Sequence, residues 1–184
     1  MIPSSAWADT IDRWHEFYLM AGTAAVTLAG LLFVAISLHV DALVRETREH
    51  LVSLARVTLS SFLFVMVLSL LMLIPHESTR VTGSMLVTLG VPFIVITLRQ
   101  MRGSATAHSD FSLGLFRRRL LVPLIGYAGT AAVGFLLMSR RTDWLTGLVS
   151  VTILLLSNAA GTSWDLLVRV ARIRHHGEPE REHR

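Results

Sequence analysis

Residues 17–40 read FYLMAGTAAVTLAGLLFVAISLHV, an apolar stretch without a charged side chain. A helix needs roughly 20 apolar residues to cross a hydrocarbon core about 30 Å thick. This stretch is long enough, and it is rich in Gly, Ala and Thr, the residues that let membrane helices approach one another closely. It therefore predicts a membrane-spanning helix.

Four further stretches have the same character. The five predicted spans are residues 17–40, 51–75, 81–98, 120–138 and 144–168. Together they contain only two charged side chains, Arg56 and Asp165. Because each stretch is about as long as a bilayer is thick, the sequence predicts an all-α, polytopic bundle of five transmembrane helices.

The third stretch allows an alternative with four spans. Residues 81–98 contain Gly83, Gly90 and Pro92, which weaken a helix. Membrane helices tolerate such residues, because neighbouring helices satisfy the freed backbone groups. Five spans are favoured, since the alternative would leave an uncharged apolar run inside a loop.

Polar segments separate the spans. Residues 41–50 predict a short connection, and residues 99–119 predict a loop that ends in three arginines. Pro123 is expected in the first turn of the fourth span, where a proline does no harm. Residues 169–184 predict a charged tail whose first two turns extend the last helix.

The composition excludes several classes of protein. Hydrophobic residues make up 52% of the 184 residues and the mean hydropathy is +0.56, which leaves no room for a separate soluble catalytic domain. The chain has no cysteine, and its 8 histidines form no metal-ligand motif. No nucleotide-binding or nucleophile motif occurs either. We therefore expect no enzyme activity, no cofactor and no metal.

The basic residues indicate an orientation. All 17 are arginines, as is typical of GC-rich bacterial genomes. Five spans leave only Arg13, Arg80, Arg140 and Arg141 on the side of the amino terminus and the other 13 on the side of the tail, whereas four spans would divide them 12 to 5. The positive-inside rule then predicts a bacterial plasma-membrane protein with its amino terminus outside and its tail cytoplasmic. Arginines beside spans also account for the pI of about 10.9, so we expect no binding of nucleic acid.

The first span carries a weakly polar stripe. Steps of four and three residues return to one face of a helix. From Glu16 they reach Met20, Thr23, Thr27, Gly30, Val34, Ser37 and Asp41. If several copies gathered around an axis, the stripe would line a narrow pore with carboxylates at both mouths. The alternative is that the stripe packs against a neighbouring helix, as Ala21, Ala25 and Ala29 on the adjacent stripe would.

Three further polar residues lie within spans. Arg56 and Asp165 each lie about one turn from the predicted cytoplasmic boundary, where a side chain can reach the headgroups. Asp165 also precedes Arg169 by four residues, which favours an ion pair within one helix. Asn158 lies near mid-membrane and is expected to hydrogen-bond to another helix. For Arg56 and Asp165, structural anchoring is favoured over transport.

Part of the sequence resembles a known family. The motifs that carry the resemblance are Trp14-His15-Glu16-Phe17-Tyr18, Gly22-Thr23-Ala24-Ala25, Leu28-Ala29-Gly30-Leu31-Leu32-Phe33-Val34 and Ser37-Leu38-His39. They resemble a family of small multi-pass membrane proteins from GC-rich bacteria. The resemblance covers mainly the first helix and implies a bacterial plasma-membrane location, but no particular activity.

Taken with the stripe, these features favour a homo-oligomer that passes cations. Small residues along the first span, and Gly126, Thr130 and Gly134 along the fourth, predict self-association. The acidic ends of the stripe would concentrate cations. An alternative function is an accessory subunit that binds a larger membrane complex, such as a protease or a transporter, through the charged tail. The expected partners are therefore the lipid bilayer, further copies of the chain or, in the alternative, another membrane protein.

Overall fold

Five long helices make up the computed structural model, which describes residues 4–38, 49–74, 78–104, 110–139 and 144–176. The helices are α1 (Ser4–Leu38), α3 (Glu49–Leu73), α4 (Thr79–Ser104), α5 (Asp110–Met138) and α6 (Leu145–His176). The described residues contain no strand. Each helix holds one apolar span: Trp14–Leu38, Ala55–Leu73, Thr79–Arg102, Leu120–Met138 and Leu145–Leu166. The predicted all-α bundle of five transmembrane helices is confirmed.

The third span is a continuous helix, so the alternative with four spans is wrong. Pro92 lies on the exposed face of α4, whereas Gly83 and Gly90 are buried. A Cβ built on Gly83 would lie 2.6 Å from the carbonyl oxygen of Gly134, and one on Gly90 would lie 3.0 Å from that of Tyr127. The glycines that weaken this helix in isolation thus let α4 pack closely on α5.

Two expectations about the ends of helices are corrected. Residues 99–119 are mostly helical, because α4 continues to Ser104 and α5 begins at Asp110. Pro123 consequently lies in the interior of α5 rather than in its first turn. Hydropathy marks the apolar part of a helix and not its ends, and helix packing in a membrane accommodates an interior proline. The extension of the last helix into the tail is confirmed, since α6 ends at His176.

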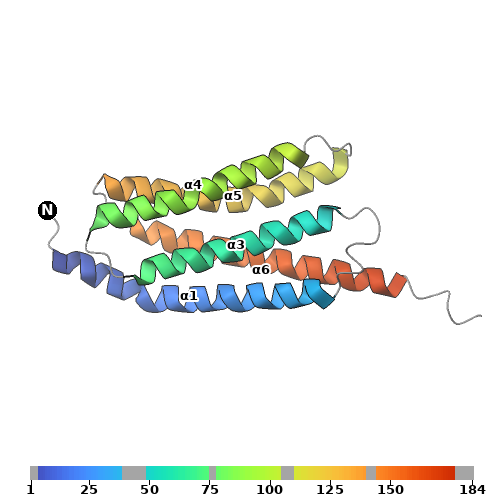
Figure 1. The fold of residues 1–184 in the computed structure, drawn as a ribbon, viewed down its shortest axis with the longest axis horizontal. Coiled ribbons are helices and arrows are strands. Elements are labelled where there is room, and N and C mark those ends of the chain that lie inside the picture. The colour runs from blue at the N-terminus through green and yellow to red at the C-terminus, as the bar shows by residue number, and fades with distance from the viewer. Residues whose placement is uncertain (1–3, 39–48, 75–77, 105–109, 140–143, 177–184) are drawn as a thin grey trace, which may run out of the picture.

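The helices pack in a fixed order around α3. In Figure 1, α4 and α5 lie side by side at one edge, α1 lies at the opposite edge, and α3 and α6 lie between them. Half of the most apolar stretch of α3 is buried (50%), against 17% in α1. The helices alternate in direction, so α1 begins at one end of the bundle and α6 ends at the other. One side of α1 therefore remains outside the bundle.

Aromatic rings fill the centre of the bundle. Phe64 of α3, Phe93 of α4 and Tyr127 of α5 are in mutual contact, with ring centroids 4.5 to 5.3 Å apart. The Tyr127 hydroxyl lies 3.1 Å from the Oγ atom of Ser61, so its polar group is satisfied within the core. This core ties α3, α4 and α5 together, and α1 packs on its outside.

Candidate functional site: the outer face of α1

The predicted stripe lies on the outer face of α1. All of its described members are exposed: Glu16, Met20, Thr23, Thr27, Gly30, Val34 and Ser37. Met20 is 68% exposed and Val34 is 53% exposed, and a Cβ built on Gly30 would meet no atom within 4 Å. Asp41 lies outside the described residues. In a single copy, the described part of the stripe therefore faces away from the described helices and lines no channel among them.

The opposite face of α1 makes the contacts with the bundle. Tyr18, Ala21 and Ala25 are buried there, at 1%, 5% and 0% exposure. The Tyr18 hydroxyl pairs with the side chain of Thr152 on α6. Packing is thus carried by the alanine stripe, as expected for it, and not by the polar stripe.

Gly22 lets α1 approach α3 closely. A Cβ built on Gly22 would lie 2.9 Å from Cβ of Ser69 and 3.4 Å from its Oγ atom. That Oγ atom is buried and has no hydrogen-bond partner among the described residues. It faces the Cα–H of Gly22, which is a weak donor. Together with the burial of Tyr18, Ala21 and Ala25, this contact turns the stripe away from α3.

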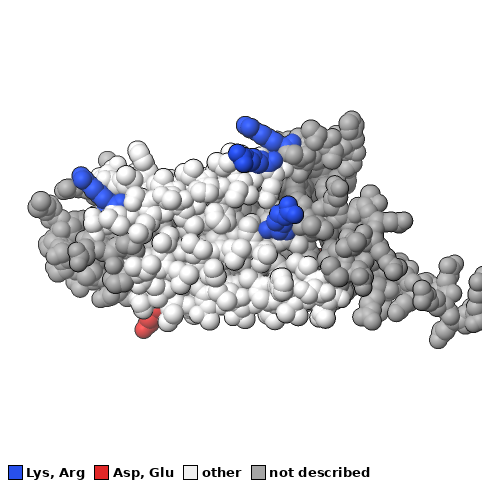
Figure 2. Space-filling model, in the orientation of Figure 1, with Lys and Arg blue, Asp and Glu red and all other residues white. Residues whose placement is uncertain are grey.

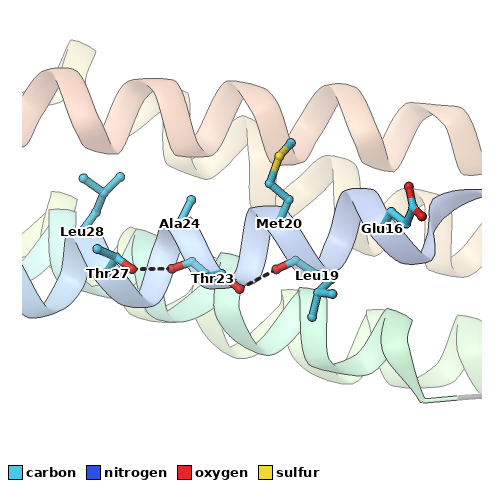
Figure 3. Close-up of a pocket in the computed structure, with 7 residues that line it drawn as sticks. All are labelled: Glu16, Leu19, Met20, Thr23, Ala24, Thr27 and Leu28. Carbon is cyan, nitrogen blue, oxygen red and sulfur yellow. Dashed lines mark hydrogen bonds between the residues drawn. The ribbon is translucent and has the colours of Figure 1, made fainter.

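The hydroxyl groups on the stripe are bound to their own helix. Thr23 donates to the carbonyl of Leu19 at 2.8 Å, Thr27 to that of Thr23 at 2.8 Å, and Ser37 to that of Phe33 at 2.9 Å. Figure 3 shows the first two of these bonds. Since each proton is used inside the helix, each hydroxyl presents only its oxygen lone pairs outwards. The stripe therefore offers acceptors, which suit cations, rather than donors.

A groove of about 610 Å³ runs along the first half of the stripe. It is lined by Glu16, Leu19, Met20, Thr23, Ala24, Thr27 and Leu28. In Figure 3 the side chains of Glu16, Met20, Ala24 and Leu28 lie along one side, and the two threonines lie beside them. The lining is mostly apolar, with a carboxylate at one end, and it comes from α1 alone. No other described helix contributes a residue to this lining.

The heptad steps did not identify three of the groove residues, namely Leu19, Ala24 and Leu28. Each is adjacent in the chain to a stripe residue and widens the same face. Adding the helical neighbours of the stripe would have found them, since a face about 100° wide includes them.

The fourth-span packing face is used inside the monomer. A Cβ on Gly126 would lie 2.6 Å from Leu155 of α6, and one on Gly134 would lie 2.7 Å from the Gly83 carbonyl of α4. Thr130 is fully buried between them. This face is therefore occupied within a single copy, and the predicted self-association would have to use the first helix, where the sequence most simply placed it. The outer face of α1, by contrast, consists of exposed residues among those that the structure describes.

The three other polar residues lie apart from the stripe. Arg56 is exposed near the beginning of α3, and Asp165 is half-buried near the end of α6, so both lie at the same end of the bundle. Asn158 is half-buried, and its backbone carbonyl accepts a 2.8 Å hydrogen bond from the Thr162 hydroxyl. Among the described residues, no group of three His, Asp or Glu side chains could hold a metal ion.

No protein-family model, curated protein or solved structure matches the chain. The five apolar helices make it a multi-pass membrane protein. The resemblance of its first helix to a bacterial family stays a prediction, and function has to be inferred from the outer face of α1.

Proposed function

We propose that several copies of the chain associate through the outer face of α1 and pass small cations along it. The observation that supports the proposal is the exposure, in a single copy, of every stripe residue that the structure describes. Lipid chains have no hydrogen-bonding groups, and small residues in membrane helices favour helix–helix contact over contact with lipid. A ring of α1 helices would remove the stripe from lipid and enclose it around an axis.

The chemistry of the stripe suits a cation. Glu16 lies at one end of the groove, and the sequence places Asp41 at the other end of the stripe. Between them the Thr23, Thr27 and Ser37 hydroxyls present acceptor oxygens. Carboxylate rings concentrate cations, while the few weak ligands between them allow the ion to leave.

Neutralising both acidic ends should reduce the cation flux. Purified protein in liposomes should conduct, and the double variant Glu16→Gln with Asp41→Asn should conduct less at every voltage, because the local cation concentration falls. Asp165→Asn is the matched control, since it removes a carboxylate that lies off the stripe. Absence of flux, or a flux that the double variant leaves unchanged, would contradict the proposal.

We propose that the protein lies in the bacterial plasma membrane with its amino terminus outside. Support comes from the 13-to-4 division of arginines and from the two opposite ends of the bundle at which α1 begins and α6 ends. Reporter fusions at Met1 and Arg184 should therefore report opposite sides of the membrane. A cytoplasmic signal from both fusions would overturn the orientation.

The same exposed face also favours a second candidate, an accessory subunit of a larger membrane complex. With only 17% of its most apolar stretch buried, α1 could receive a helix of another protein as readily as a second copy. Purification from native membranes distinguishes the two: a stoichiometric foreign partner together with absent flux would favour the accessory subunit.

A further inference from the structure

Among the side chains that the structure describes, three arginines gather at one end of the bundle. Arg56 lies near the beginning of α3, and Arg99 and Arg102 lie near the end of α4. Because these helices run in opposite directions, the three positions share one end. All three side chains are exposed. Figure 2 shows the basic side chains grouped at this end of the visible face, with one at the opposite end.

A small apolar cluster lies beside two of these arginines. Val57 of α3 and Leu120 of α5 are buried together, and Met101 of α4 packs against them. Arg56 and Arg102 are the chain neighbours of Val57 and Met101. The cluster therefore holds the arginine-bearing ends of two helices together, and the guanidinium groups extend from its rim.

The arginines lie at the depth of the lipid headgroups. The spans of α3 and α4 run Ala55–Leu73 and Thr79–Arg102, so all three arginines fall within about one turn of a span end. Within the described part of the chain, none of them pairs with a carboxylate. A guanidinium group that has no carboxylate partner can bind a phosphate with two parallel hydrogen bonds.

We propose that this end of the bundle binds the phosphate headgroup of an anionic phospholipid through Arg56, Arg99 and Arg102. A lipid fits better than a soluble phosphate, because exposed apolar side chains continue from the arginines into the span. Ile96 and Leu98 of α4 are 47% and 40% exposed and precede Arg99. Acyl chains can cover them while the headgroup meets the guanidinium groups.

Thermal unfolding of the full chain in detergent tests this site. Added phosphatidylglycerol should raise the unfolding midpoint, whereas phosphatidylcholine and inorganic phosphate at matched concentrations should not. Each arginine near an anionic lipid surface strengthens binding about fivefold, so removing three should weaken it about a hundredfold. The variant carrying Arg56→Gln, Arg99→Gln and Arg102→Gln should thus lose the midpoint shift over the range that saturates the wild type.

Two further variants make the test selective. Arg80→Gln removes an exposed arginine from the opposite end of the bundle and should keep the full response. Arg99→Lys with Arg102→Lys keeps the charge but removes the two-pronged geometry, and should bind with intermediate affinity. Circular dichroism establishes whether each variant is folded. If the triple variant does not fold, the double lysine variant is used for the test in its place. A phosphatidylglycerol response as large as that of the wild type, in the triple variant or in the double lysine variant, would overturn the proposal. An equal loss in Arg80→Gln, or a full response to inorganic phosphate alone, would also overturn it.

Discussion

Replacing Gly134 with valine should destabilise the bundle by about 3 kcal/mol or more, since inserting atoms into a packed contact forces backbone to move. A Cβ at this position would lie 2.7 Å from the carbonyl oxygen of Gly83, 2.9 Å from Cβ of Leu86 and 3.0 Å from the amide nitrogen of Val87. Two of these atoms are backbone, so no rotation of a side chain relieves the overlap. The helices α4 and α5 would have to separate along their length.

The matched control is Gly161→Val on α6. A Cβ on Gly161 would meet no atom within 4 Å, and this glycine is exposed. The same substitution should there change stability by less than about 1 kcal/mol, the difference in helix propensity. Unfolding in mixed micelles of increasing denaturing detergent measures both variants. Equal stability of the two would show that α4 and α5 do not cross at Gly134.

The sequence was sufficient for the spans and for the grouping of residues on helix faces. Uncharged runs locate each apolar helix, because hydrocarbon tolerates few charges. Heptad steps from Glu16 find residues that share one face, because that follows from helix geometry alone. The same rule placed Ala21 and Ala25 on one adjacent face, and both are buried.

The sequence did not reveal which partner each face meets. In a membrane, lipid is as apolar as a neighbouring helix, so the pattern of one helix does not distinguish a face that packs from a face that meets lipid. The small residues Gly126 and Gly134 of α5 were therefore as compatible with a contact between two copies as with a contact inside one chain. In the structure they contact α6 and α4 of the same chain. The pairing of Tyr127 with Ser61 likewise joins residues far apart in sequence. Hydropathy also did not predict where α4 and α5 end, because both helices extend past their apolar parts.

Replacing Gly30 with leucine should abolish cation flux, with or without loss of the multimer, while leaving the single bundle folded. In one copy, the Cβ of the new side chain would meet no atom within 4 Å. Leucine is also a better helix former than glycine by up to about 1 kcal/mol, so stability should be unchanged or slightly higher. In a ring of α1 helices, however, a leucine near the middle of the stripe would hold the helices apart or fill the axis.

Cross-linking in native membranes measures the assembly, and flux in liposomes measures conduction. Gly161→Leu is the matched control, because Gly161 is also exposed in open space but lies on α6. We expect discrete multimers and wild-type flux for this control, and background flux for Gly30→Leu. Multimers that persist without flux still agree with the proposal, because leucine would then fill the axis. Wild-type flux in Gly30→Leu, or equal loss in Gly161→Leu, would move the conduction path away from α1, because only a path along the stripe responds to Gly30 alone.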